Sequence, residues 1–305
     1  MFRRPCRSPW ACLVLVVALV ASAVLTACGG PSSEGAPSGA DASASPYKIG
    51  FLVASTGSSS LLGEPERDAA VMLQRQFAAQ GGIAGPDGVR HPVEILIYDT
   101  QGSGDTAITL AKKLINDEGV VAIVGTTISP EAMALLPVIE EAGTPLISMA
   151  SSGAIVSPVA ERHWVFKSAQ SNEHTAPSQV RYAAALGVER IANVYVNNAY
   201  GEDGAIAIRD AAAEAGIEIV LEETFDAADT DMTAQLTKLR ASGAEALLVT
   251  AIPPAAAILT KQFREMGISM PIIHNHGIGM KSFIDLCGAS VAEGVVFPMG
   301  KVIAA

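Results

Sequence analysis

Short apolar runs and longer amphipathic segments alternate along the chain from residue 48 to residue 152. The short runs are rich in β-branched residues, as buried strands are, and the longer segments repeat apolar residues at helical spacing. Strands are expected at 48–55, 93–99, 120–124 and 145–149, and helices at 63–80, 105–117 and 130–142. This alternation predicts an α/β fold built on a parallel, doubly wound sheet.

The same alternation resumes after residues 164–168. Strands are expected at 190–196, 217–225, 245–251 and 271–275, and helices at 174–186, 202–215, 231–242 and 254–266. A glycine closely follows each of these helices, where a C-terminal cap belongs, at Gly187, Gly216, Gly243 and Gly267. The sequence therefore predicts two doubly wound parallel-sheet lobes, 47–168 and 169–298, with a ligand cleft between them.

The stretch 120–153 carries the clearest candidate for ligand chemistry. Hydroxyl side chains follow both of its strands, at Thr126, Thr127, Ser129, Ser151 and Ser152. Ligands of open α/β sheets bind at the carboxyl ends of strands, and the free N–H groups of a helix start suit a carboxylate. Ser129 is therefore expected to bind an anionic group, with helix N-capping as its alternative role.

The N-terminus has the features of a secretory signal. Three arginines precede an apolar run at 10–25. The run ends in Leu-Thr-Ala-Cys28, which resembles a bacterial lipobox, so residues 1–27 are expected to be a lipoprotein signal peptide and Cys28 the lipidated residue. A plain signal peptide or an N-terminal membrane helix is the alternative, although the run is short for a membrane span. Residues 28–46 are rich in Gly, Ser, Ala and Pro and are expected to form a flexible tether.

The composition narrows the classes of function. A net charge of −11 over 305 residues disfavours binding to nucleic acid. Cys6 and Cys12 lie in the signal segment and Cys28 is the expected lipid site, so Cys287 has no partner for an internal disulfide. Because its neighbours are apolar, Cys287 is interpreted as a core residue rather than a reactive thiol.

Signatures of enzymes are missing from the sequence. It contains no G-x-G-x-x-G after the first strand, no Walker A loop and no G-x-S-x-G elbow. We therefore expect no catalysis and no cofactor.

Several short motifs, taken in order, resemble a known family. They are Gly50, Gly57 and Gly63, then Gly81-Gly-Ile-x-Gly85, Tyr98-Asp99, Val124-Gly-x-x-x-Ser129, Pro145-Leu-Ile-Ser, Ala150-Ser-Ser, Tyr200-Gly201 and Glu293-Gly294. From residue 46 to residue 299 the chain resembles the periplasmic substrate-binding lipoproteins of ABC importers, of the leucine/isoleucine/valine type. The resemblance implies a type I periplasmic-binding fold whose two lobes are joined by three crossovers and close on a ligand.

The resemblance also implies a set of ligand-binding residues. The family's ligand contacts fall on Ser129, Ala150, Ser152, Asn172 and Tyr200. Two lining positions that are aromatic in the family fall on Leu62 and Ile252. The acidic residue that pairs with a ligand ammonium group falls on His276, and an imidazole is a poor partner for a cation. The expected ligand is therefore an amino acid or a related small carboxylate, with carboxylates that lack an α-ammonium favoured.

His274 and His276 also allow a different interpretation. Alternate residues of a strand share a face, so both imidazoles can approach one metal ion. A structural zinc site needs about four ligands, and no Cys pair or suitably spaced Glu completes the set. No metal site is therefore predicted.

The predicted function is capture of a small solute by hinge closure, for delivery to an ABC permease. The protein is expected outside the cytoplasm, held at the membrane by the lipid on Cys28. A ligand-sensing receptor with the same fold is the first alternative, and an enzyme is the second. Residues 299–305 resemble the start of a return crossover, so the chain is interpreted as truncated at its C-terminus.

Overall fold

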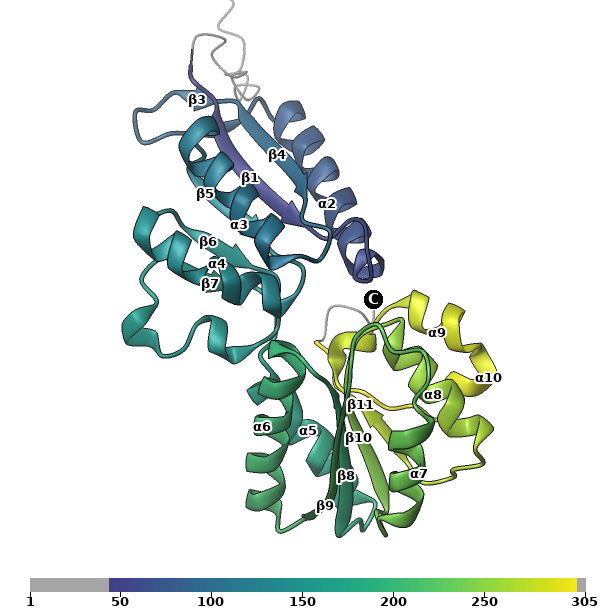
Figure 1. Cartoon of the computed structure of the whole chain (residues 1–305). Helices are drawn as coiled ribbons and strands as arrows, with labels where there is room; N and C mark the ends of the chain where they lie inside the picture. Colours follow the sequence, from purple (N-terminus) through teal and green to yellow (C-terminus); the bar gives the residue numbers. More distant parts are fainter. Residues whose placement is uncertain (1–43, 301–305) are drawn as a thin grey trace, which may run out of the picture.

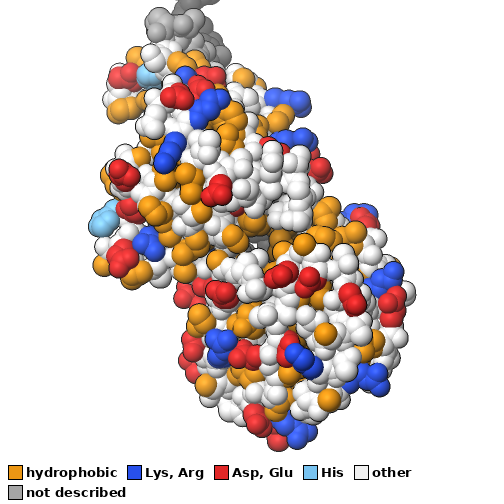
Figure 2. Space-filling model, in the orientation of Figure 1, with side chains coloured by type: hydrophobic (Ala, Val, Ile, Leu, Met, Phe, Trp, Pro, Cys, Tyr) orange, Lys and Arg blue, Asp and Glu red, His pale blue; other side chains and the backbone are white. Residues whose placement is uncertain are grey.

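The computed structural model describes residues 44–300, which form two α/β lobes. In Figure 1 the first lobe lies above the second, and the two meet at a junction between them. The signal peptide, Cys28 and most of the tether lie outside the described residues, as do residues 301–305. Figure 2 shows the two lobes as separate bodies with a narrower waist between them. Within the described range, no helix combines the length and the apolar character that a membrane span needs.

The first lobe is built on a parallel sheet with the strand order β4-β1-β5-β6-β7. Its strands are β1 (Tyr47–Val53), β4 (Val93–Asp99), β5 (Ala122–Gly125), β6 (Leu146–Ser148) and β7 (Val165–Lys167). A small antiparallel pair, β2 (Ile83–Ala84) and β3 (Arg90–His91), precedes β4. The connections contain α2 (Ser60–Ala79), α3 (Gly104–Lys113), the π-helical turn η1 (Leu114–Glu118), α4 (Ser129–Ala142), η2 (Gly153–Ile155) and η3 (Val159–Glu161).

Helices cover both faces of this first sheet. On one face, α3 and α4 pack a core around Leu52, Ile123 and Leu146. On the other face, Ala70 of α2 packs against Phe51 and the neighbouring strands. Parallel strands buried on both faces explain why their sequences are continuous apolar runs rather than alternating patterns.

The second lobe repeats this plan with the strand order β11-β10-β8-β9. Its strands are β8 (Arg190–Val196), β9 (Glu218–Phe225), β10 (Ala246–Thr250) and β11 (Ile272–His274). Its helices are α5 (Asn172–Ala185), α6 (Ala199–Ala215), α7 (Thr233–Ala241), α8 (Ala255–Glu265), η4 (His276–Ile278), α9 (Lys281–Cys287) and α10 (Ala289–Ala292). Helices α5 and α6 cover one face of the sheet, and α7, α8 and α9 cover the other. The predicted fold class, two doubly wound parallel-sheet lobes, is confirmed.

Some element boundaries differ from those predicted, for local reasons. Helix α6 begins at Ala199, three residues early, because the Asn198 side chain caps it by accepting the backbone N–H groups of Tyr200 and Gly201. Strand β11 ends at His274, and His276 lies in a separate helical turn. The two imidazoles therefore do not alternate along one strand.

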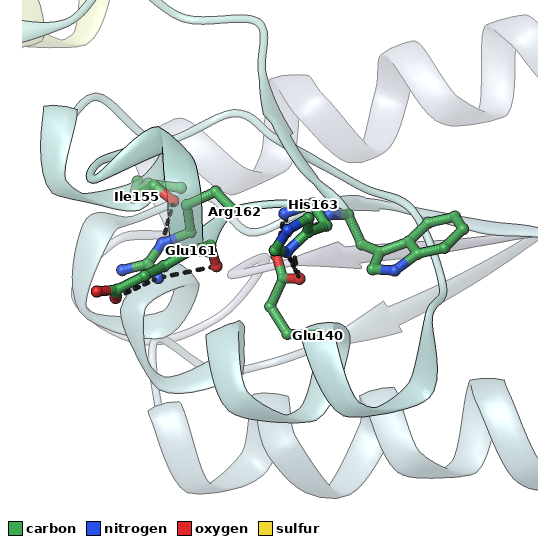
Figure 3. A network of polar contacts seen from close by, with 6 residues as sticks. Glu140, Ile155, Glu161, Arg162 and His163 are labelled. Carbon is green, nitrogen blue, oxygen red and sulfur yellow. Dashed lines mark hydrogen bonds and ion pairs between the residues drawn. The ribbon is translucent and has the colours of Figure 1, made fainter.

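A network of polar contacts fixes the long connection between β6 and β7 (Figure 3). The Glu140 carboxylate of α4 accepts the backbone N–H groups of His163 and Trp164 at 3.0 and 3.1 Å. Arg162 Nε donates to the Ile155 carbonyl at 3.2 Å. Because β7 is the last strand before the chain crosses to α5, this network positions the crossover.

Polar contacts also join the two lobes. Asp203 of α6 accepts the backbone N–H groups of Gly153 and Ala154 at 3.0 and 3.4 Å. Its second carboxylate oxygen accepts from Asn172 Nδ2 at 2.7 Å. Asp203 therefore links the second lobe to the turn that follows β6 in the first.

Candidate functional site

A cavity of about 370 Å³ lies between the lobes, at the carboxyl ends of the strands. In the first sheet, β1 has β4 on one side and β5 on the other, and in the second sheet β8 lies between β9 and β10. At these two strands the order in which successive strands are added to the sheet reverses. Open α/β sheets bind ligands at such topological switch points. The loops after β1, β5, β8 and β10 all contribute to the cavity wall.

Ser129 connects two of the loops that form the first-lobe wall. It is the first residue of α4 and lines the cavity, although its own exposed area is only 2%. Its Oγ accepts the backbone N–H of Ser152 at 3.1 Å, which leaves the hydroxyl hydrogen available for a ligand. The residue in the N-cap position is Ile128, so the alternative capping role for Ser129 does not apply.

The start of α4 supplies further donors. The first N–H groups of a helix have no acceptor within the helix, and they carry the positive end of its dipole. Because Ile128, Ser129 and Pro130 line the cavity, this end of the helix faces the space between the lobes. Pro130 has no N–H and the Ile128 N–H donates to Glu131 Oε2 at 3.5 Å, so Ser129 supplies the backbone donor among these three. The arrangement suits a negatively charged group.

Thr127 connects the same wall to a buried carboxyl behind it. Its hydroxyl donates to Glu66 Oε2 at 2.6 Å and accepts the backbone N–H of Ala54 at 2.9 Å. Burial raises the pKa of Glu66 to about 7, although the hydrogen bond from Thr127 opposes that shift. Burial also raises the pKa of Glu131 in the first turn of α4. Neither carboxyl lines the cavity.

Tyr200 is the main aromatic residue of the second-lobe wall. Its side chain is 7% exposed, and its phenolic oxygen lies beside the backbone of Gly277. Burial raises the pKa of the hydroxyl, so it is protonated at neutral pH. Among residues 44–300 the hydroxyl makes no hydrogen bond of good geometry, although the Gly277 backbone N–H lies near enough to oppose the rise of its pKa. A buried, unpaired hydroxyl that lines a cavity is a ready donor for a ligand.

His276 closes the cavity between the lobes. Its Nε2 lies 2.9 Å from Ser151 Oγ of the first lobe, and its ring meets Tyr200 edge to face at 6.2 Å. Its Nδ1 contacts Asn275 Oδ1, which can only accept, so Nδ1 carries the proton and Nε2 accepts from Ser151. Burial, helped by the nearby charge of Lys167, lowers the pKa of His276 to about 4. The imidazole is therefore neutral at physiological pH.

The structure brings five of the eight predicted ligand-binding residues to the cavity wall. These are Leu62, Ser129, Tyr200, Ile252 and His276. Ala150 is buried between two lining residues, Met149 and Ser151, without lining the cavity itself. Ser152 also lies behind the wall, and its role there is to donate its N–H to Ser129.

Asn172 lies at the junction of the lobes rather than in the cavity wall. It is fully buried, and its Nδ2 donates to the Tyr200 carbonyl as well as to Asp203. Its Oδ1 accepts from Asn275 Nδ2 at 3.0 Å. These contacts position Tyr200 and the turn that carries His276.

Several lining residues were not singled out from the sequence as ligand contacts. They include Ser58, Ser59, Thr127, Asn198, Pro254 and Met280. Most of them lie in a loop that follows a strand, as the residues singled out from the sequence do. Their position after a strand end is therefore the sequence feature that could have identified them as lining residues. Met280 lies farther along the chain and carries no such signal.

No group of three or more metal-ligating side chains comes together within residues 44–300. His274 is buried in the second lobe, where its Nε2 lies 2.9 Å from Thr260 Oγ1, whereas His276 faces the cavity. Cys287 is buried and free, as the interpretation as a core residue expects.

Two parallel-sheet lobes around a cavity at their strand ends define the class of two-lobed solute-binding proteins. The family described as "Periplasmic binding protein" matches residues 46–302. The chain belongs to the periplasmic binding protein family.

Curated relatives and solved structures agree with this family. A leucine-, isoleucine-, valine-, threonine- and alanine-binding protein of Pseudomonas aeruginosa is 24% identical over 82% of this chain. Leu/Ile/Val-binding protein homolog 8 of Brucella abortus is 28% identical over 81% of it. The chain spans 65% and 62% of the length of these two relatives.

Two solved structures have the same fold. The substrate-binding protein LivJ of Streptococcus pneumoniae, in complex with isoleucine, has a TM-score of 0.74 and 26% identity, and the match covers 84% of this chain and 72% of LivJ. An extracellular ligand-binding receptor of Rhodopseudomonas palustris also has a TM-score of 0.74 and 26% identity, covering 82% of this chain and 66% of the receptor.

Proposed function

We propose that this chain captures a small carboxylate-bearing solute between its lobes, as the receptor of an ABC importer outside the cytoplasm. The observation that most directly supports this proposal is the cavity, in which a helix start and serine and threonine hydroxyls face a largely aliphatic wall. The family relationship supports this reading, because the Pseudomonas aeruginosa relative is named as an amino-acid-binding protein and LivJ was solved in complex with isoleucine. On this proposal the first lobe (47–168) holds the carboxylate and the second lobe (169–298) closes over the rest.

The mechanism we propose is hinge closure without covalent chemistry. Ser129 donates to the carboxylate from the first lobe, and Tyr200 donates to a second acceptor on the ligand from the other side. Because the ligand contacts both lobes, it stabilises the closed state relative to the open one. The permease then recognises the closed state. Anchoring through Cys28 keeps the receptor near the membrane.

A thermal-shift screen of the purified chain tests the binding step. We expect at least one amino acid or small carboxylate to raise the melting temperature, because a ligand that binds the folded state stabilises it. Ser129→Ala should weaken binding of that ligand about tenfold, the value of one hydrogen bond to a charged group. Failure of every amino acid and small carboxylate to shift the melting temperature would argue against the proposal.

Ser242→Ala is a matched control for this experiment. Ser242 Oγ also accepts a backbone N–H at 3.1 Å, from Ala244, but it lies outside the cavity wall. Each substitution therefore removes a serine hydroxyl that accepts one backbone N–H, and Ser242→Ala also removes a hydrogen bond to the Leu239 carbonyl at 2.8 Å. Equal losses of affinity in the two variants would show that Ser129 acts only through stability.

A further inference from the structure

Within residues 44–300, the side chains that line the cavity include no carboxylate and no fixed cation. Among the residues that line it, none is Asp, Glu, Lys or Arg, and the side chains that can titrate are His276 and Tyr200. Figure 2 shows the charged side chains distributed over the outer surfaces of both lobes instead. A ligand ammonium group that loses its water in this cavity would have no carboxylate to replace it, which is costly.

Three carboxyl groups on the elements that form or support the cavity loops already have partners. Asp203 accepts two backbone N–H groups and the Asn172 amide. Asp99 accepts from the hydroxyl of Thr56 at 2.6 Å. Glu66 accepts from Thr127, and with a pKa of about 7 it is largely protonated below that pH. None of these groups is available to a ligand ammonium without breaking a contact of the fold.

A half-buried lysine lies behind the same wall. Lys167 ends β7, and its Nζ donates to the Ser151 carbonyl at 2.8 Å. Its ammonium forms no ion pair with any carboxylate of the described residues, and burial lowers its pKa to about 8. The charge of Lys167 is felt at His276, whose pKa it helps to lower. Ser151 and His276 both line the cavity, so the positive charge of Lys167 reaches this part of the wall, as the negative charge of Asp203 reaches Tyr200 on the opposite side.

We propose that the ligand is a monoanion without a cationic group, a carboxylate on an uncharged body, and that Lys167 sets this preference from behind Ser151 and His276. This inference rests on the proposed function, and it narrows the ligand class of the same cavity. Lys167 acts on the ligand through its electric field, since it does not line the cavity itself.

Two matched series of probes test the ligand class by calorimetry on the purified chain. The first is 4-methylpentanoate, leucine and 4-methylpentanamide, and the second is 3-phenylpropanoate, phenylalanine and 3-phenylpropanamide. Within a series the carbon skeleton is constant, and only the α-ammonium or the charge of the head group changes. In the series that fits the cavity, we expect the carboxylate to bind at least tenfold more tightly than the amino acid and the amide.

The outcomes separate this inference from the proposed function. An amino acid that binds as tightly as its matched carboxylate, or any screening hit that carries an ammonium group, overturns the inference and leaves solute capture intact. If none of the six probes binds and the thermal-shift screen is also negative, solute capture itself fails. A screening hit that is an anion without a cationic group supports both.

Lys167→Met tests the role of the lysine. We expect the variant to lose about tenfold in affinity for the carboxylate and less than twofold for the amide. Lys112→Met, on the exposed face of α3, is the control and should change neither. Equal losses for carboxylate and amide would show that Lys167 is only structural, and would overturn its part in the proposal.

The wild-type chain offers a second measurement if Lys167→Met does not fold. Between pH 7 and pH 9, Lys167 loses its charge, while His276 on η4 is already neutral. Asp203 on α6 and Glu173 on α5 are the acidic groups whose fields reach Lys167. We expect carboxylate affinity to fall over this range while amide affinity stays constant. A carboxylate affinity that is independent of pH from 7 to 9 would contradict the proposal.

Discussion

The two walls of the cavity have the same backbone plan and different chemistry. In both lobes the first strand of the sheet lies between the second and third, and the loops after these strands face the cavity. The first-lobe wall offers serine and threonine hydroxyls and the start of α4. The second-lobe wall is mainly aliphatic, with Val196, Ile252 and Met280, apart from a few polar groups that include Tyr200. The scaffold thus determines where a ligand binds, and the loops determine which part of it each lobe recognises.

The shared plan extends to a close contact between helix and strand in each lobe. Gly63 of α2 approaches the end of β1, where an added Cβ would lie 2.0 Å from the Ala54 carbonyl oxygen. Gly201 of α6 approaches the end of β8, where an added Cβ would lie 1.8 Å from the Val196 carbonyl oxygen. Both contacts hold the helix that follows the first strand of a lobe's sheet against a loop of the cavity wall.

The largest expected effect is therefore common to both lobes. Gly63→Ala and Gly201→Ala should each lower the free energy of unfolding by about 3 kcal/mol, because the backbone must shift to accept the methyl group. Urea unfolding measures the loss. Gly104→Ala in α3 is the control, since its added Cβ would lie 3.1 Å from the Ala134 Cβ and 4.0 Å from the Pro130 carbonyl oxygen, without a backbone clash. If one lobe tolerates its alanine as well as Gly104→Ala does, the two lobes do not share this packing.

The lobes differ in how their buried titratable groups respond to pH. In the first lobe, burial raises the pKa of Glu66 from 4.5 to about 7. The folded chain therefore holds a proton that the unfolded chain releases, and stability from Glu66 is lost as pH rises from 4.5 to 7. In the second lobe, burial lowers the pKa of His274 from 6.5 to about 3. The stability linked to this residue is present above pH 6.5 and is lost as pH falls from 6.5 toward 3.

Glu66→Gln separates these opposing contributions. The variant should be more stable than the wild type by about 2 kcal/mol at pH 7.5, because it removes the cost of ionising a buried carboxyl. The difference should shrink toward zero below pH 4.5, where Glu66 is protonated in both the folded and the unfolded state. Urea unfolding at several pH values measures it. Glu64→Gln on the exposed face of the same helix is the control, and a constant difference across pH would refute the assignment.

Much of the fold was predictable from the sequence because its information is local. Alternating apolar runs and glycine-terminated helices predicted both sheets, and position at a strand end predicted Ser129 at the cavity. Asn172 and Ser152 were harder to place, because their partners Asp203 and Ser129 lie about 31 and 23 residues away in the chain. No sequence motif pointed to Lys167, because its proposed role depends on its partial burial and on its having no ion pair within residues 44–300.

The smallest expected effect concerns Tyr200, which places a polar hydroxyl in the largely aliphatic second-lobe wall. Removing this hydroxyl tests how far the two walls differ in polar recognition. Tyr200→Phe should leave the ligand-free chain as stable as the wild type or up to about 1 kcal/mol more stable, because the hydroxyl it removes is buried without a partner. Affinity for the ligand should fall about threefold to tenfold if the hydroxyl donates to it, as one neutral hydrogen bond would. Unfolding and calorimetry on the same samples measure both quantities.

The matched control for this last substitution is Tyr182→Phe, which removes a hydroxyl from an exposed position on α5. It should change neither stability nor affinity. If Tyr200→Phe destabilised the ligand-free chain by more than about 1 kcal/mol, the hydroxyl would have a partner within the protein. The second-lobe wall would then contribute only shape through Tyr200, and recognition of polar groups would fall more heavily on the first lobe.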